Sequence, residues 1–228
     1  MSNSVAIIGS AERTDNELRL LRKNPKLMQQ IEKFVLDQIV NKWKLNTRET
    51  TLVSGGSSWV DHVAVRLWLQ DPTKWKGLEL YLPQEWDGCN ARYVNKYDGM
   101  RLNELHLKFN KSSLSLDELH DAQRLGATCH VISTGFLARN VKIAQNCTHM
   151  LAFTFVMNPS QRHQPKIINS GTGYTWNKCL SLFKLHKSLY DFIPIPLPVI
   201  STEKIEVKQD ILNKGEVGKP PNPNQNQS

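Results

Sequence analysis

Three short loops carry the residues of this sequence that are best suited to bind a phosphate. Residues 54–58 read Ser-Gly-Gly-Ser-Ser and residues 170–175 read Ser-Gly-Thr-Gly-Tyr-Thr, each at the start of a stretch with helical character. Glycine lets a phosphate come close to the backbone, and a helix N-terminus offers free N–H groups and a partial positive charge. In the third loop, residues 9–13, Arg13 can reach a phosphate and Glu12 a hydroxyl.

From these loops we predict a set of ligand-binding residues and two candidate catalytic carboxylates. The candidate carboxylates are Glu12 and Asp61, the latter in the first turn of the helix expected after residues 54–58. Arg139 and Asn140 lie on a later helix and would add a positive charge and a hydrogen bond. The predicted ligand-binding residues are Gly9, Ser10, Arg13, Gly55, Gly56, Ser57, Ser58, Arg139, Asn140, Gly171, Thr172, Gly173 and Thr175. A plainer interpretation makes each loop a tight turn and Asp61 a carboxylate that stabilises a helix start.

Several well-known catalytic and cofactor motifs are missing from the sequence. Neither glycine loop is followed by Gly-Lys-Ser or Gly-Lys-Thr, so neither is a Walker A sequence, and GxGxxG is absent after the first apolar run. The serines after residue 53 form no GxSxG elbow, which leaves acyl transfer without support. The histidines show no paired metal-ligand spacing. We therefore predict no metal site and no cofactor.

Short apolar runs and amphipathic stripes indicate the fold class. The predicted strands are residues 5–8, 50–53, 78–82, 150–156 and 192–195. Amphipathic stripes at residues 27–39 and 60–68 separate the first three of them. Two βα units followed by a third strand indicate right-handed crossovers between parallel strands. The pattern therefore predicts an α/β fold with a mainly parallel five-stranded sheet, and in such sheets ligands bind outside the carboxyl ends of the strands.

Capping and breaking residues predict where two of the helices begin and end. Asp15 is expected to cap the first helix, and Pro25 is expected to divide that helix into two segments. Ser115 and Glu118 have the spacing of a capping box, which predicts a helix over residues 116–125.

The rest of the chain is less regular. Residues 84–115 are polar, aromatic and weakly periodic, and we interpret them as an insertion with little regular structure. Helices are expected from Phe136 onward and from residue 176 to about residue 187. We predict a single domain over residues 1–200 and a polar, disordered tail over residues 201–228.

Net charge and cysteine usage limit the compartment and the partners. The net charge of +8 lies in residues 1–202, because residues 203–228 hold four lysines and four acids. This excess suits an anionic ligand and equally suits loose contact with nucleic acid. No apolar run approaches the roughly 18 residues of a membrane span, and the N-terminus lacks a signal-peptide pattern. Four scattered cysteines favour reduced thiols, so we predict a cytoplasmic protein with no membrane partner.

Five motifs in a fixed order resemble the SLOG superfamily of Rossmann-like nucleotide-binding domains, and in particular its YspA-like branch. That branch shows a strand ending in GSR, a VSGGARGAD-like loop, a GPIRN-like helix start, an ALVAF-like strand and a loop containing Gly-Thr. The corresponding stretches here are residues 7–10, 53–61, 135–140, 149–153 and 171–175. The likeness covers residues 5–195 and is poorest over residues 84–130.

The resemblance implies a Rossmann-like three-layer sandwich, a nucleotide-derived ligand, and a chain that can pair with itself through helices beside the site. Relatives in the superfamily include cytokinin-activating phosphoribohydrolases, DNA-processing protein A and ligand-sensing domains of immune systems. The phosphoribohydrolases carry PGGxGTxxE, whose glutamate takes part in base cleavage. The matching stretch here ends in Asn177, so this sequence lacks the family's carboxylate.

Three functional hypotheses remain open at this point. The first is a protein that binds or senses a nucleotide or a related phosphorylated nucleoside, without turnover. The second is an N-glycosidase acting on nucleoside monophosphates, with Glu12 or Asp61 as its carboxylate. The third is a nucleic-acid-binding protein akin to DNA-processing protein A, although the lysines and arginines are dispersed and form no aromatic-interleaved stripe.

Overall fold

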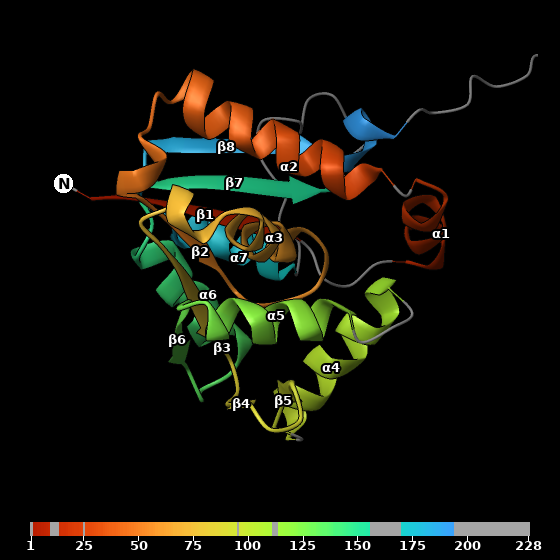
Figure 1. Ribbon diagram of the computed structural model, residues 1–228. Coiled ribbons are helices and arrows are strands. Elements are labelled where there is room, and N and C mark those ends of the chain that lie inside the picture. The colour runs from red at the N-terminus through yellow and green to blue at the C-terminus, as the bar shows by residue number, and fades with distance from the viewer. Residues whose placement is uncertain are drawn as a thin grey trace, which may run out of the picture. The chain divides into compact units, whose positions relative to one another are not determined.

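A six-stranded parallel sheet forms the centre of the structure, a computed structural model (Figure 1). The model describes residues 2–9, 14–24, 26–94, 96–110, 114–155 and 170–193. The strands are β1 (Asn3–Gly9), β2 (Thr50–Ser54), β3 (Gly77–Leu82), β6 (Thr128–Val131), β7 (His149–Thr154) and β8 (Phe183–Ser188). Their order across the sheet is β6-β3-β2-β1-β7-β8, and every neighbouring pair is parallel. The structure therefore confirms the α/β fold with a parallel sheet, and it has one strand more than the sequence predicts.

Helices cover both faces of this sheet and make it the middle layer of three. The described helices of four or more residues are α1 (Asp15–Lys23), α2 (Leu27–Asp37) with its π-helical extension Gln38–Lys42, α3 (His62–Gln70), α4 (Tyr97–Asn110), α5 (Leu114–Arg124), α6 (Phe136–Gln145), α7 (Gly171–Lys178) and the 3-10 helix Leu189–Phe192. Three-residue 3-10 helices span Thr47–Glu49, Trp59–Asp61 and Pro72–Lys74. A two-stranded antiparallel hairpin, β4 (Trp86–Asp87) and β5 (Arg92–Tyr93), precedes α4.

Alternating residues of each strand send their side chains into two separate cores. On β1, Val5 and Ile7 pack into a core that also holds apolar residues of α2, α3, α4 and α5. Ala6 and Ile8 face the opposite way, into a smaller core with α6 and α7. The two cores, one on each side of the sheet, confirm the three-layer Rossmann-like sandwich.

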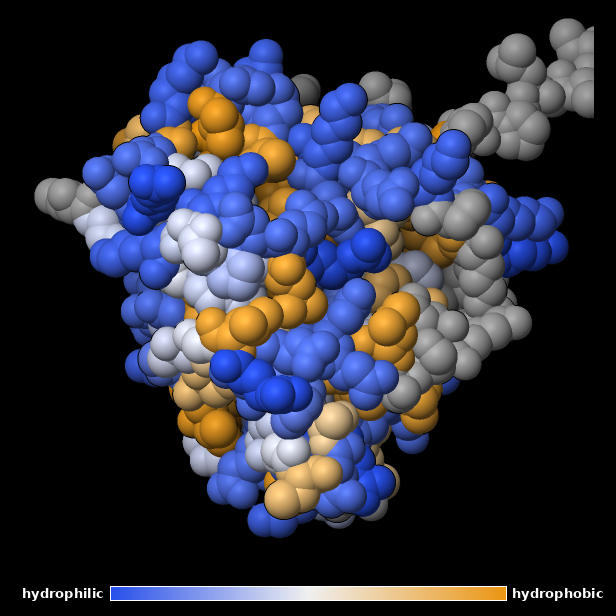
Figure 2. Space-filling view, in the orientation of Figure 1, coloured by the Kyte–Doolittle hydropathy of each residue, from blue (hydrophilic) through white to orange (hydrophobic). Residues whose placement is uncertain are grey.

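The visible surface of the molecule is mostly hydrophilic (Figure 2). In the space-filling view, hydrophilic residues cover most of the visible face, and the hydrophobic residues that reach it form separate patches (Figure 2). Among the described residues, no helix is both long enough and apolar enough to cross a membrane.

Two of the sheet's strands differ from the sequence prediction. The strand β6 has only four residues and is half-exposed at one edge, so it carries no apolar run that would reveal it. At the other edge, β8 reads Phe-Lys-Leu-His-Lys-Ser, with lysines on both of its faces, and most of it lies in the stretch predicted as a helix at 176–187. The final strand predicted at 192–195 is wrong at both of its described residues, because Leu189–Phe192 form a 3-10 helix and Ile193 is its C-cap; residues 194 and 195 lie outside the described residues.

Helix boundaries also correct several predictions. The helix predicted from residue 176 begins earlier, at Gly171, and ends at Lys178. Thr14 rather than Asp15 is the N-cap of α1, and it forms a complete capping box with Glu17. The predicted break of this first helical stretch is present, since α1 ends at Lys23 and α2 begins at Leu27, while Pro25 itself lies outside the described residues.

The segment predicted as an irregular insertion is largely structured. Residues 84–115 contain the β4–β5 hairpin and the 14-residue helix α4. Ser115 is not a cap, because α5 begins one residue before it and the Ser115 hydroxyl lies 2.9 Å from Nδ1 of His106. Glu118 contacts His62 instead of completing a capping box, at 2.6 Å. The other ring nitrogen of His106, Nε2, lies 3.0 Å from the carbonyl oxygen of Gly56, and this contact attaches the segment to the loop after β2.

The described residues all belong to one compact unit, which spans Met1–Pro194. The predicted tail at residues 201–228 lies outside the described residues, so the predicted domain boundary at residue 200 stays a prediction.

Candidate functional site

The direction in which the chain builds the sheet reverses between β1 and β7. From β1 the chain adds β2, β3 and β6 on one side, and then returns to place β7 and β8 on the other side of β1. Loops leaving the two central strands diverge at such a reversal, which opens a crevice at the carboxyl ends of the strands. A ligand site in this fold is therefore expected beyond Gly9 and Thr154, the last residues of β1 and β7.

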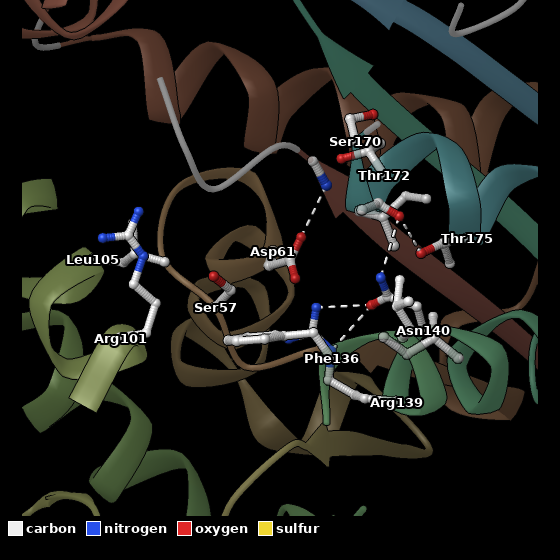
Figure 3. A pocket seen from close by; sticks show the side chains of 15 residues that line it. Ser57, Asp61, Arg101, Leu105, Phe136, Arg139, Asn140, Ser170, Thr172 and Thr175 are labelled. Carbon is white, nitrogen blue, oxygen red and sulfur yellow. Dashed lines mark hydrogen bonds between the residues drawn. The ribbon is translucent and has the colours of Figure 1, made fainter. Parts of the chain in front are cut away.

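A pocket of about 420 Å³ lies at this crevice (Figure 3). The end of β1 and the loop after β2 form one part of its wall, and α4, α6 and the start of α7 form the rest. Its lining residues are Ile8, Gly9, Ser57, Asp61, Arg101, Leu105, Phe136, Leu137, Arg139, Asn140, Ile143, Ser170, Gly171, Thr172 and Thr175. Pockets of a few hundred Å³ with apolar walls and a few convergent polar groups are typical of small-molecule sites.

Arg139 joins three of these wall segments through hydrogen bonds. Its Nη1 donates to the carbonyl oxygen of Gly55 at 2.9 Å, which reaches the loop after β2. Its Nε and Nη2 donate to Oδ1 of Asn140, at 3.1 and 2.9 Å. Asn140 in turn donates from Nδ2 to the carbonyl oxygen of Gly171 at 3.3 Å, at the start of α7. The dashed lines of Figure 3 follow the Arg139–Asn140 and Asn140–Gly171 bonds.

The guanidinium of Arg139 is a buried positive charge. The residue is 7% exposed, and burial lowers the pKa of its guanidinium, while the charge of Asp61 acts to raise it. Its hydrogen-bond acceptors are all neutral carbonyl oxygens, and within the described part of the chain no carboxylate lies within 4.0 Å of it. A buried charge without an ion pair is costly unless something else compensates it, and a bound anion would do so.

Asp61 faces the pocket from the short helix ahead of α3. Its Oδ1 accepts a hydrogen bond from the backbone N–H of Gly9 at 2.9 Å, so the carboxylate joins the end of β1 to the loop after β2. Gly55 has no room for a side chain, because a Cβ there would lie 2.8 Å from both Arg139 Nη1 and Asp61 Oδ2. The glycine therefore lets these two opposite charges approach the loop.

Two buried hydroxyls in the pocket wall lack a hydrogen-bond partner within the part of the chain that the structure describes. Ser57 Oγ and Thr172 Oγ1 have no hydrogen-bond partner among the described residues, although the two residues are only 2% and 4% exposed. A buried hydroxyl that lacks a partner carries a desolvation cost, and a ligand oxygen can remove it. Thr172 also lies in the first turn of α7, where backbone N–H groups have no partner within the helix.

The structure brings together most, though not all, of the residues predicted from the sequence. The predicted residues that line the pocket are Gly9, Ser57, Asp61, Arg139, Asn140, Gly171, Thr172 and Thr175. Gly55, Gly56, Ser58 and Gly173 do not line it. Ser10, Glu12 and Arg13 lie outside the described residues. The expected binding role of each residue stays a prediction.

Sequence reasoning missed the apolar wall and the contribution of α4. Leu105 and Arg101 come from α4, within the segment taken to be irregular. Phe136 packs under Arg139, whose Cζ lies 5.3 Å from the ring centroid. The apolar residues of α4 show only weak helical periodicity, so the sequence did not predict this helix. Phe136, in contrast, begins a predicted helix and could have been predicted as a pocket residue from that position. Among the described residues, no group of three or more histidine, cysteine or acidic side chains could hold a metal ion.

Comparisons with known proteins give one sequence relative and several distantly similar solved structures. No protein-family model matches the chain. DNA processing protein A of Helicobacter pylori, solved for its single-stranded DNA binding mode, is 14% identical, with a TM-score of 0.34 over 92% of this chain and 82% of that one. The same protein of Streptococcus pneumoniae is 15% identical, with a TM-score of 0.33 over 83% of this chain and 60% of that one. At these TM-scores we draw no conclusion about this chain from the two structures.

The sequence relative is much closer. The uncharacterized protein R261 of Acanthamoeba polyphaga mimivirus is 34% identical over 192 residues, which cover 81% of this chain and 95% of the viral protein. Identity at this level over nearly the whole of the relative indicates common descent. The chain belongs to the same protein family as this mimivirus protein.

Proposed function

We propose that this protein binds a nucleotide or a nucleotide-derived phosphorylated ligand in the pocket between β1 and β7. The observation that carries the proposal is the buried guanidinium of Arg139, whose hydrogen bonds all go to neutral oxygens. A phosphate would bring a negative charge into direct contact with this guanidinium, which Asp61 does not, and charge-assisted hydrogen bonds from arginine are among the stronger polar contacts in proteins.

The remaining walls suit the other parts of such a ligand. The unpartnered hydroxyls of Ser57 and Thr172, with the first turn of α7, provide donors for phosphate or ribose oxygens. Phe136, Leu105 and Ile8 provide apolar surface against which a base can pack. A pocket of about 420 Å³ is within the usual range for a ligand of this size.

Asp61 supports hydrolysis of the ligand as a second candidate function. It is the one carboxylate among the described residues that line the pocket, and a carboxylate can activate water or stabilise an oxocarbenium-like transition state. The hydrogen bond from Gly9 holds this carboxylate at the pocket edge. Asn177, which stands where the resembling hydrolases carry a glutamate, is exposed and does not line the pocket.

Membership of the SLOG superfamily and of its YspA-like branch is part of this proposal and rests on the five sequence motifs. Sensing, a cytoplasmic location and self-association likewise remain proposals. Binding of nucleic acid rests only on the net charge of +8, and it enters as an outcome of the test below.

The test is to incubate the purified protein with a panel of nucleotides and to follow bound ligand and products by mass spectrometry. We expect one nucleotide to be retained unaltered, and Arg139→Gln to weaken its binding by about 30-fold, the equivalent of roughly 2 kcal/mol for a charge-assisted contact. Arg124→Gln, an exposed arginine at the end of α5, is the matched control and should bind like the wild type.

The other outcomes separate the competing functions. Release of free base, abolished in Asp61→Asn, would replace binding by N-glycoside hydrolysis. Retention of no nucleotide, together with salt-sensitive binding of single-stranded DNA or RNA that Arg139→Gln leaves intact, would refute the proposal and favour a nucleic-acid partner.

A further inference from the structure

Two cysteines meet at the far end of the helices that carry the pocket residues. Cys147 follows α6, and Cys179 is the C-cap of α7. Their sulfur atoms lie 3.6 Å apart, in contact but not bonded. The residues are 32 positions apart in sequence, so their approach is a product of the fold.

We propose that Cys147 and Cys179 are a redox pair, in which a peroxide oxidises the two thiols to a reversible disulfide that cross-links the C-terminal ends of α6 and α7. This inference concerns a second site and does not depend on the proposed nucleotide function.

The location of the two residues allows the bond to form. A disulfide brings its sulfurs to about 2 Å, so the pair must close by about 1.5 Å. Both cysteines lie just beyond the ends of helices rather than within them. Rotation about the Cα–Cβ bonds and small shifts of these connecting residues can supply this movement without disturbing the helical hydrogen bonds.

The surroundings of the pair favour a thiolate. The Lys184 ammonium donates to the carbonyl oxygens of Cys179 and Trp176 at 3.0 and 3.2 Å, which places a positive charge beside the sulfurs. The hydrogen bond with the Cys147 thiol, a backbone hydrogen bond from Ser181 and the charge of Lys184 lower the pKa of the Cys179 thiol. The pair therefore loses its first proton more readily than an isolated thiol, and the thiolate is the form of cysteine that reacts with oxidants.

The reaction balances with one molecule of peroxide. Cys147 is half-buried, whereas Cys179 is 2% exposed, so peroxide approaches the pair from the side of Cys147. The proton of the Cys147 thiol first moves across the hydrogen bond between the two sulfurs to the Cys179 thiolate. The resulting Cys147 thiolate attacks one peroxide oxygen, the O–O bond breaks, and hydroxide leaves as a sulfenic acid forms. Cys179 then loses its proton to that hydroxide and attacks the sulfenic sulfur. The S–S bond forms, the S–O bond breaks, and the second hydroxide leaves and is protonated to water. Two thiols have then lost two electrons, and hydrogen peroxide has become two molecules of water.

The cross-link would act on the helices that present the pocket residues. The middle of α6 is already joined to the first residue of α7 by the hydrogen bond from Asn140 to the carbonyl oxygen of Gly171. A disulfide between residues 147 and 179 would join their C-terminal ends and close a loop that contains β7 and α7. The two helices would then be joined at both of these places in the folded protein. Because the disulfide also persists in the unfolded chain and restricts its conformations, oxidation should raise the thermal midpoint.

The test treats the full-length reduced protein with a slight excess of hydrogen peroxide, blocks free thiols with N-ethylmaleimide, and digests the unreduced protein. We expect mass spectrometry to show the peptides of Cys147 and Cys179 joined, and to show them separate after treatment with dithiothreitol. The exposed Cys89 and the half-buried Cys129 are internal controls and should remain alkylated. Because this measurement uses the wild-type protein, it does not depend on how any variant folds.

A second measurement uses the matched variants. Oxidation should raise the thermal midpoint of the wild type and of Cys129→Ser by several degrees, and should leave that of Cys147→Ser unchanged. The proposal is overturned if Cys147 and Cys179 remain alkylated after peroxide treatment. It is also overturned if Cys89 or Cys129 is consumed as fast as the pair, or if linked peptides join cysteines at random.

Discussion

The two glycine-rich loops, residues 54–58 and 170–175, have similar compositions but are held in different ways. Behind the first loop, the carbonyl oxygen of Gly56 accepts hydrogen bonds from the Tyr93 hydroxyl and from Nε2 of His106, both buried. Burial raises the pKa of Tyr93, which therefore remains a donor at neutral pH. The second loop is the first turn of a helix, capped by its own Ser170 through the N–H of Gly173.

The comparison shows that glycine has a different structural role in each loop. Gly56 has φ +63, and a Cβ there would lie 2.5 Å from Leu82 Cδ2 and 2.7 Å from the Tyr93 hydroxyl. It is required by the fold of the loop, and it does not line the pocket. Gly171 lines the pocket, and its Cβ would be 3.2 Å from Nδ2 of Asn140. The first loop is a fixed structural turn, whereas the second presents its backbone to the pocket.

The largest expected effect is on stability, when alanine replaces each of these glycines in turn. Gly56→Ala should lower the free energy of unfolding by about 3 kcal/mol, because it adds left-handed backbone strain to the collision with Leu82 and Tyr93. Gly171→Ala, whose contact is looser, should cost less than about 1 kcal/mol. Urea unfolding of both variants checks the comparison, and equal losses would contradict the view that only the first loop is rigidly specified.

The next effect is a dependence of stability on pH that originates behind the first loop. Burial, with the neighbouring His62, lowers the pKa of His106 to about 3, so its ring is neutral in the folded protein. The unfolded chain takes up a proton at this histidine below about pH 6.5, and its contribution to stability therefore falls by about 1.4 kcal/mol per pH unit between pH 6.5 and pH 3. Between pH 7 and pH 5 the expected loss from His106 is about 2 kcal/mol.

His106→Gln isolates this contribution, because glutamine can still donate to Gly56 but does not titrate. Its free energy of unfolding should fall less steeply between pH 6.5 and pH 5 than that of the wild type. Buried His62 has a lowered pKa as well and should maintain part of the slope. His120→Gln, on α5, is the control. A variant slope equal to the wild-type slope would show that His106 takes up its proton equally in the folded and unfolded states, which contradicts the lowered pKa.

The smallest expected effect distinguishes the two unpartnered hydroxyls. Thr172→Val keeps the shape of the side chain and removes a hydroxyl that has no partner within the described chain, so stability should not fall. If the ligand is bound chiefly by the second loop, affinity for the retained nucleotide should drop about five-fold, close to 1 kcal/mol, and Ser57→Ala should change it less. Calorimetric titration measures both, and a larger loss in Ser57→Ala would transfer the main binding role to the first loop.

Local patterns in the sequence predicted the central part of the sheet. Apolar runs revealed β1, β2, β3 and β7, because a strand buried on both faces must be apolar throughout. The edge strands β6 and β8 were missed since their exposed faces admit histidine and lysine, which erase the pattern. The position of α4 over the pocket could not be predicted, because it depends on contacts between segments far apart in the chain.

The candidate site shows the same division. Glycine loops and their order along the chain were enough to predict Ser57, Asp61 and Thr172 as neighbours at one edge of the sheet. The partners of Gly56 were not predictable, since Tyr93 and His106 lie 37 and 50 residues away from it and carry no motif. The spacing of residues in the sequence predicts where a loop lies. Only the three-dimensional structure shows which distant side chains contact and stabilise the loop.

The helix α4, which lies between β3 and β6 in the sequence, forms a part of the pocket wall that can change without changing the sheet. Arg101 and Leu105 reach the pocket from α4, yet the sheet pairing of β3 with β6 does not depend on either side chain. Under the proposed function, substitutions on the pocket face of α4 would alter which ligands bind, while the strands, Arg139 and the start of α7 stay as they are. We therefore expect proteins descended from a common ancestor to differ in ligand specificity chiefly through this helix.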